Sequence, residues 1–424
     1  MAERWTDQQK QAYSSFGHDI LVSAGAGSGK TAVLSERVYR HVAERHIDVD
    51  RLLVLTFTNK AANEMKVRIR NKIRKDESGL FASEEEKARQ INKIDSSSIM
   101  TFDAYALSLI RKYHYLFDLD RNIGIIDSNV LKIASERFID EVMERRYAEK
   151  DSAFLSLIKK HCIKNDDIIR KAVRDLNDRL EMIYDRKEYI QNYEERFYSE
   201  EALDRSVREY TEVLSNTVDQ IRAKAEKLSW LVENVSDYFI GLDDLYRCET
   251  YDDLFRTLPL CDKTGKNLPR GSGQEASELK KGIGSALEEL KKKTVSKEEI
   301  LSEIASTKQD TLLLLELCEE LEEKLAGFKR ECGLYSFIDI FKMAIELVDR
   351  YPDVKKQISE GFAEILIDEY QDTMTFRRNS SPASLTATSI WSVTSNSPST
   401  VSGMRIRISS RTGTFDICRE MTAN

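Results

Sequence analysis

The chain has 424 residues, of which 41% are hydrophobic and 33% charged, and its formal net charge is −8. This length predicts two or three domains with packed cores, and the acidic balance excludes a global basic field for nucleic acid, although not a local basic groove. The six cysteines have no C-x-x-C spacing, the histidines form no metal-ligand pattern, and no apolar run reaches membrane-spanning length. We therefore expect a cytoplasmic protein with reduced cysteines, no signal peptide and no membrane partner.

The first hundred residues alternate between short apolar runs and helix-like stretches. Residues 5–16 predict a short helix with Thr6 as its N-cap. Apolar runs at 20–22, 52–56 and 99–101 predict short strands, each followed by a helical pattern. Strands that alternate with helices favour an α/β fold with a doubly wound parallel sheet.

The loop after the first strand has the pattern of a phosphate-binding loop. Its residues are Ala24, Gly25, Ala26, Gly27, Ser28, Gly29, Lys30 and Thr31. Three glycines let backbone N–H groups point at one anion, and the helix that follows adds the positive end of its dipole. Lys30 can reach the β- and γ-phosphates of a nucleotide, and the Thr31 hydroxyl can bind Mg²⁺. Ala24 stands where the usual pattern has glycine, and the alternative is a Gly/Ser-rich turn that caps a helix.

The middle of the chain has a different pattern from its two ends. Strand signals vanish between about 125 and 335, where charged residues alternate with Leu and Ile at helical spacing. We expect a compact helical domain and not a coiled coil, because sustained heptads are absent. The sheet pattern returns at 362–367, in an apolar strand that ends in two adjacent acids.

These acids, Asp368 and Glu369, predict the second half of a nucleotide site. Asp368 would hold Mg²⁺ directly or through water, and Glu369 would orient or deprotonate the attacking water. The alternative is an acidic turn after a core strand, which the phosphate loop in the same chain makes the weaker interpretation.

Four motifs in this order resemble those of superfamily 1 DNA helicases of the UvrD/Rep type, to which the AddA and RecB helicase-nucleases are related. They occupy residues 5–9, 24–31, 56–65 and 367–373. The resemblance implies a P-loop RecA-like parallel sheet flanked by helices at 1–124 and 336–373, with a large all-α domain inserted at 125–335. It also implies ATP and Mg²⁺ as cofactors, and ATP hydrolysis coupled to translocation on single-stranded DNA and unwinding.

The resemblance gives roles to individual residues of the nucleotide site. Gln9 matches the glutamine that reads adenine, and the whole phosphate loop counts as cofactor-binding. Lys30, Asp368 and Glu369 match residues that act in hydrolysis, and Gln371 matches a glutamine that couples the state of ATP to DNA.

The resemblance also implies a path for DNA. Phe57, Thr58 and Asn59 match a motif that lines the single-strand path, where bases stack on an aromatic face. A core aromatic is the alternative for Phe57. Tyr105 keeps an aromatic of a further DNA motif, whereas Asp103 stands where many relatives have histidine, so we expect a contact from Tyr105 only. Basic pairs in the helical middle could contact duplex DNA, but solvated helix surface is the favoured account.

Residues 374–424 differ in composition from the rest, with 19 Ser or Thr among 51 residues and no lysine. One interpretation is a disordered low-complexity tail. A second is translation out of frame, because permissible codons in a neighbouring frame restore a further family motif under residues 391–408. On that interpretation the chain is truncated before a second motor domain, and unwinding by this polypeptide alone is impaired.

Two alternatives to a competent helicase stay open from the sequence. An SMC- or Rad50-like ATPase also has an N-terminal phosphate loop, a long charged middle and a late acidic strand, but this chain has no L-S-G-G-Q-type signature. A non-catalytic remnant that binds ATP and DNA shares the motifs without turnover. Single-stranded and duplex DNA are the expected partners, and the sequence specifies no nuclease or repair partner.

Overall fold

The structure is a computed structural model, and it describes most of the chain. The described residues are 5–17, 20–23, 27–76, 79–368, 375–377, 384–386, 402–405 and 416–418. The chain divides into two compact units, which are described separately below. Unit 1 comprises Met1–Glu144, Arg174–Arg186 and Glu320–Asn424. Unit 2 comprises Arg145–Val173 and Lys187–Glu319.

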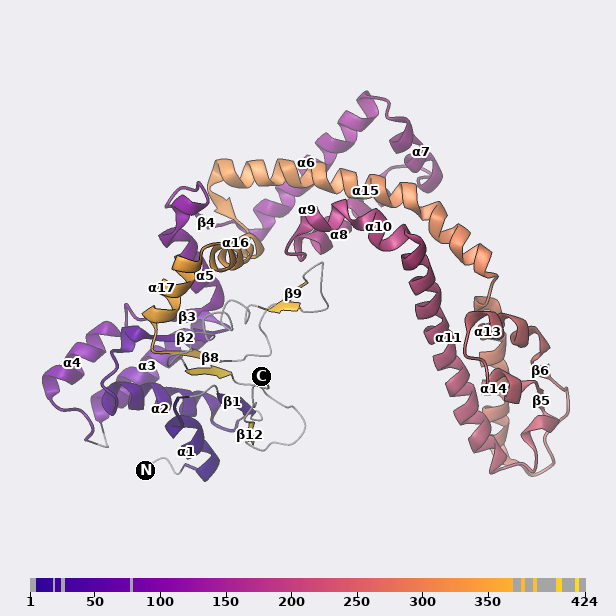
Figure 1. Cartoon of the computed structure of the whole chain (residues 1–424), viewed down its shortest axis with the longest axis horizontal. Helices are drawn as coiled ribbons and strands as arrows, with labels where there is room; N and C mark the ends of the chain where they lie inside the picture. Colours follow the sequence, from indigo (N-terminus) through magenta and orange to yellow (C-terminus); the bar gives the residue numbers. More distant parts are fainter. Residues whose placement is uncertain are drawn as a thin grey trace. The chain divides into compact units, whose positions relative to one another are not determined.

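Unit 1 combines a parallel sheet with helices (Figure 1). Its helices are α1 (Asp7–Ser14), α2 (Lys30–Ala43), α3 (Asn59–Lys75), α4 (Glu84–Lys93), α5 (Phe102–Lys112), α16 (Phe337–Arg350) and α17 (Pro352–Gly361), with 3-10 turns at Val49–Arg51 and His114–Leu116. Its main strands are β1 (Ile20–Ser23), β2 (Leu52–Thr56), β3 (Ile99–Thr101) and β8 (Glu364–Ile367). The short strands are β4 (Gly124–Ile125), β7 (Leu334–Tyr335), β9 (Thr375–Arg377), β10 (Ser384–Thr386), β11 (Ser402–Arg405) and β12 (Asp416–Cys418). Four helices have residues in both units: α6 (Ser128–Ala148), α8 (Asp167–Glu181), α9 (Arg186–Gln191) and α15 (Lys297–Cys332).

The main sheet has the strand order β12-β1-β11-β8-β2-β3. All neighbouring strands in it are parallel except β12, which runs antiparallel to β1. The expected α/β class with a parallel sheet is therefore confirmed. The tail at 374–424, for which a disordered segment was one of two interpretations, contains the short strands β9–β12, and its other residues lie outside the described part of the chain. The open edges of β1 and β8 offer backbone N–H and C=O groups, and β11 pairs with both.

The burial of β2 shows why helices cover both faces of this sheet. All five of its residues are buried. Leu52 and Val54 pack in a core with residues of α1, α2 and α3, while Leu53 and Leu55 pack with α5, α16 and α17. Figure 1 shows these two sets of helices on opposite sides of the strands. Because side chains alternate along a strand, a run that is apolar throughout needs cover on both faces.

Local sequence signals place the ends of the first elements. Strands β2 and β3 have the expected bounds, and Thr6 caps α1 as expected. Helix α3 begins at Asn59, because the Thr58 hydroxyl accepts a hydrogen bond from the Ala61 N–H and so caps the helix. The strands β4 and β7 beside the helical middle were not expected, nor were β5 (Phe239–Ile240) and β6 (Asp262–Lys263) within it. Each has two residues, which is too short for a periodic pattern.

Unit 2 is built mainly from helices. Its elements are α7 (Ser152–His161), α10 (Tyr193–Tyr198), α11 (Glu200–Ser229), β5 (Phe239–Ile240), α12 (Leu242–Leu245), α13 (Tyr251–Thr257), β6 (Asp262–Lys263) and α14 (Gly273–Lys293), with 3-10 turns at Val235–Asp237 and Leu258–Leu260. Leu214, Ile221 and Leu228 recur every second turn on α11 and are buried in one core with Ile283 and Leu287 of α14. Among the residues that the structure describes, no helix is long and apolar enough to cross a membrane.

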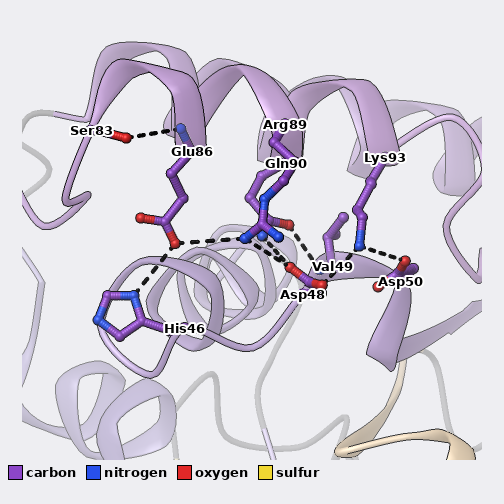
Figure 2. Close-up of polar contacts among 9 residues, drawn as sticks. All are labelled: His46, Asp48, Val49, Asp50, Ser83, Glu86, Arg89, Gln90 and Lys93. Atoms are coloured by element: carbon purple, nitrogen blue, oxygen red, sulfur yellow. Dashed lines mark hydrogen bonds and ion pairs between the residues drawn. The ribbon is translucent and has the colours of Figure 1, made fainter.

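A polar network fastens α4 to the loop before β2, as Figure 2 shows. The fully buried Gln90 amide accepts from the Val49 N–H at 3.1 Å and donates to the Asp48 carboxylate at 2.6 Å. The Lys93 ammonium donates to the same carboxylate at 2.8 Å. These hydrogen bonds from Lys93 and Gln90 lower the pKa of Asp48. The charged form of Asp48 is therefore a stabilising element of unit 1.

We expect Asp48→Asn to lower the free energy of unfolding by about 0.5–1 kcal/mol at pH 7, a modest loss because solvent screens this site. The folded pKa lies below the unfolded value of about 3.9, so the stabilisation is fully present above that value and is lost as the pH falls through the folded pKa. Urea unfolding at several pH values would measure this. Asp50→Asn is the control, since Asp50 contacts only Lys93 in this network. Equal losses for both variants at all pH values would contradict the interpretation.

Candidate functional site

The described part of the phosphate loop has the backbone that its glycines predict. Gly27 and Gly29 have φ values of +76° and +85°, a region that other residues rarely adopt. Helix α2 then begins at Lys30, and the Gly29 carbonyl accepts from the Val33 N–H at 2.9 Å. Lys30 and Thr31 thus lie in the first turn, at the positive end of the helix dipole. Ala24, Gly25 and Ala26 lie outside the described residues.

Gln9 contacts this loop from helix α1. Its side-chain oxygen accepts from the Thr6 N–H at 2.9 Å, and the Thr6 hydroxyl accepts from the Gln9 N–H at 3.2 Å, which closes a capping box. Its side-chain nitrogen donates to the Ser28 carbonyl at 3.0 Å. The structure therefore brings Gln9 and the phosphate loop together, although 19 residues separate Gln9 from Ser28.

Asp368 follows β8 at the same edge of the sheet as the phosphate loop, because β1, β11 and β8 are parallel. Its backbone N–H donates to the Leu55 carbonyl at 2.8 Å, and the residue is buried. Two strand spacings, about 10 Å, separate β1 from β8. Glu369 and Gln371 lie outside the described residues.

The oxygen ligands available at this edge suit Mg²⁺. Thr31 offers a hydroxyl and Asp368 a carboxylate, and both are hard ligands of the kind that Mg²⁺ prefers. The described part of the chain contains no cluster of three or more His, Cys, Asp or Glu residues that could hold a metal ion. The pair of Thr31 and Asp368 fits a Mg²⁺ ion that one or two protein oxygens hold together with nucleotide phosphates and water.

Phe57, Thr58 and Asn59 lie beside this edge, because β2 neighbours β8 and ends directly before them. All three are exposed, and Phe57 is 60% exposed, so the alternative of a core aromatic is wrong. The Thr58 carbonyl accepts from the Thr56 hydroxyl at 3.1 Å, which supports the turn. The arrangement holds an aromatic ring in solvent next to the start of α3.

Tyr105 has a different environment from Phe57. It is 4% exposed, packs with its ring centroid 6.1 Å from that of Phe362, and belongs to the core shared with α16 and α17. Burial raises the pKa of its hydroxyl. The structure thus places the Phe57 ring on the surface and the Tyr105 ring in the core, so the two rings do not share an exposed face.

A buried charge cluster near the site was missed from the sequence. Arg37 of α2 and Glu364 of β8 have no exposed side-chain surface and form an ion pair through the guanidinium fork. Arg37 also donates to the carbonyls of Ala12 at 3.1 Å and Ser15 at 2.5 Å, and His41 contacts the same carboxylate. Burial alone would raise the pKa of Glu364, but the contact with His41 and the charge of Arg37 lower it. The sequence signal for this cluster was Glu364, a charged residue inside an apolar strand, because a buried charge needs a buried partner.

Comparison with known proteins agrees with these features. A family model described as the UvrD/REP helicase N-terminal domain matches residues 5–379. Among similar proteins, an ATP-dependent helicase/nuclease subunit from Bacillus velezensis is 28% identical over 87% of this chain and 33% of its own length. Proteins of the same name from Bacillus cytotoxicus and Clostridium novyi are each 29% identical over 87% of this chain and 32% of their own lengths. The chain thus spans about one third of the length of these relatives.

We expect Gly29→Ala to destabilise unit 1 more than Gly27→Ala. Both variants pay for a positive φ, about 1–2 kcal/mol. A methyl group on Gly29 would also lie 3.3 Å from the Gln9 side-chain nitrogen, whereas one on Gly27 meets nothing within 4 Å. Displacing Gln9 from Ser28 adds up to about 1 kcal/mol. Urea unfolding would measure both losses. In a Gln9→Ala background the extra loss should vanish, and its persistence would contradict this cause.

Proposed function

This chain belongs to the family of UvrD/REP helicase N-terminal domains, and on that premise we propose that unit 1 binds ATP and Mg²⁺ as the motor domain of a DNA helicase. The observation that carries the proposal is the contact between Gln9 and Ser28. It holds a base-reading amide against a loop built to bind phosphate, and so joins the two parts of one nucleotide site.

Each residue of the site has a proposed task in hydrolysis. The Lys30 ammonium binds the β- and γ-phosphates, and Thr31 and Asp368 hold Mg²⁺. Mg²⁺ would neutralise the charge that develops on the transferred phosphoryl group. Glu369 orients the attacking water or accepts its proton, and Gln371 couples the state of the nucleotide to DNA.

We propose the same domain limits as the motifs imply. Residues 1–124 and 336–373 form a RecA-like domain, which the parallel sheet with helices on both faces supports. Residues 125–335 form the inserted helical domain, which the helical core of unit 2 supports. Residues 374–424 have a composition foreign to the rest, and a product of out-of-frame translation remains our account of them.

The proposed DNA path passes over Phe57, Thr58 and Asn59. An exposed ring beside amide and hydroxyl groups suits single-stranded DNA, because bases stack on the ring while polar groups bind phosphate. Tyr105 lies in the same core as Leu53 and Leu55 of β2, the strand that leads to Phe57, so it would support this path without contacting DNA itself. The relatives are named as helicase/nuclease subunits, which favours a nuclease or repair partner and duplex DNA as the substrate to be unwound.

We propose ATP hydrolysis coupled to translocation on single-stranded DNA and to unwinding as the activity of this family. The family match disfavours the Rad50-like alternative. Stimulation of ATP hydrolysis by single-stranded DNA would support a competent motor, and absence of turnover would support the non-catalytic remnant.

We expect Lys30→Ala to weaken ATP binding by about 10- to 100-fold, the contribution of one charge-assisted hydrogen bond to phosphate. Glu369→Gln should bind ATP normally but hydrolyse it about 10²- to 10⁴-fold more slowly, because only the proton acceptor is lost. Equilibrium binding of a fluorescent ATP analogue and phosphate release would measure the two effects. Glu360→Gln is the control, since Glu360 is an exposed acid on α17. Normal turnover by Glu369→Gln would refute its role.

Phe57→Ala should weaken binding of oligothymidylate by about 5- to 100-fold, because one base loses its stacking partner. Val67→Ala is the control, because it truncates a different exposed apolar residue, which lies on α3. This variant should leave the affinity unchanged. Fluorescence anisotropy at one fixed salt concentration would measure both. Equal affinities for the two variants would show that the DNA path lies elsewhere.

A further inference from the structure

We propose that Arg37 is a positioning residue for recognition of the adenine base. In this role it holds α1, which carries Gln9, at a fixed place against the phosphate loop. The inference rests on the proposed function, in which ATP binds at this loop with Gln9 beside its base. Arg37 itself lies inside the core and contacts no nucleotide, so it acts only through Gln9.

The contacts of Arg37 join three segments of unit 1. Its Nε donates to both Glu364 oxygens at 3.0 Å, which ties α2 to β8. Its Nη1 donates to the carbonyls of Ala12 at 3.1 Å and Ser15 at 2.5 Å, which ties α2 to the end of α1. Each of these segments also leads to a part of the nucleotide site, namely Gln9, the phosphate loop or Asp368.

The end of α1 needs such a donor. A helix leaves its last carbonyls without partners in its own backbone, and a cation there also interacts favourably with the helix dipole. Helix α1 has eight residues, too few to be stable without tertiary contacts. Its position therefore depends on its attachments, which include Gln9 on Ser28 near one end and Arg37 at the other.

The buried surroundings hold the guanidinium in one orientation. Arg37 lies 4.6 Å from the centroid of the Phe16 ring, and Glu364 accepts from the side of the fork opposite to α1. A lysine would keep the charge beside Glu364, but its single ammonium cannot form the planar fork and reach two carbonyls as well. Arg37→Lys thus loosens α1 while retaining a cation for the buried carboxylate.

A role confined to stability would not change which base is preferred. Phosphate binding depends on the loop and α2, which follow β1, whereas base preference depends on where α1 places the Gln9 amide. Loss of Arg37 as a positioning residue should therefore lower the affinity for ATP and leave the affinity for GTP nearly unchanged. General destabilisation should lower both affinities together.

The experiment measures the affinities of the full chain for fluorescent analogues of ATP and GTP, for the wild type, Gln9→Ala, Arg37→Lys and the double variant. We expect Gln9→Ala and Arg37→Lys each to reduce the preference for ATP by about fivefold, the effect of one hydrogen bond. The double variant should show no further reduction, because both changes remove the same contact. Glu364→Gln, which loosens the guanidinium in another way, should reduce the preference in the same direction and serves if Arg37→Lys does not fold.

Lys329→Met is the matched control. Lys329 is also a buried cation of unit 1, 2.8 Å from Asp339, and its loss should lower stability without changing the preference for ATP. An unchanged ATP preference in Arg37→Lys and Glu364→Gln, with Gln9→Ala reducing it, would overturn the role of Arg37 alone. A wild-type chain that does not distinguish ATP from GTP would instead overturn the proposed task of Gln9, and this inference with it.

Discussion

The Glu364 carboxylate is buried away from solvent, and the arrangement of α2 and β8 in unit 1 depends on pairing it. An unpaired ion in the interior costs several kcal/mol, so a cation must be held beside it whenever the sheet is formed. Arg37 meets this requirement from α2, where His41 also contacts the carboxylate, while Glu364 belongs to β8. The phosphate loop leads into α2 and Asp368 follows β8. The ion pair that neutralises this buried charge therefore also holds together the two segments that carry the halves of the proposed nucleotide site.

Patterns of neighbouring residues predicted those features of the fold that depend on neighbouring residues, such as strand bounds and helix caps. The bounds of β2 follow from a short run of apolar residues, and the start of α1 follows from the capping chemistry of Thr6 and Gln9. The phosphate loop could be recognised because its glycines and lysine are adjacent in the chain. The ion pair of Arg37 and Glu364 could not, since 327 residues separate the partners. The burial of Tyr105 was missed for the same reason, as Phe362 comes from a distant part of the chain.

In unit 2, a short run of apolar residues at regular spacing is enough to determine which face of α11 is buried. Leu214, Ile221 and Leu228 follow a seven-residue spacing on α11 without the long heptad series of a coiled coil. The spacing lasts long enough to bury one stripe of the helix against α14, and the β5–β6 pair joins the same core. Composition predicted the helices, whereas two-residue strands depend on partners that no short window of sequence contains.

Both polar ends of the Gln9 amide make hydrogen bonds within unit 1. Its oxygen closes the capping box with Thr6 and its nitrogen holds the Ser28 carbonyl. Under the proposed function, a base that draws this amide to itself competes with the helix cap or with the loop. Base recognition is then an exchange of hydrogen bonds, and its net free energy is the small difference between them. Through this exchange, binding of the base is thermodynamically linked to fraying at the first turn of α1.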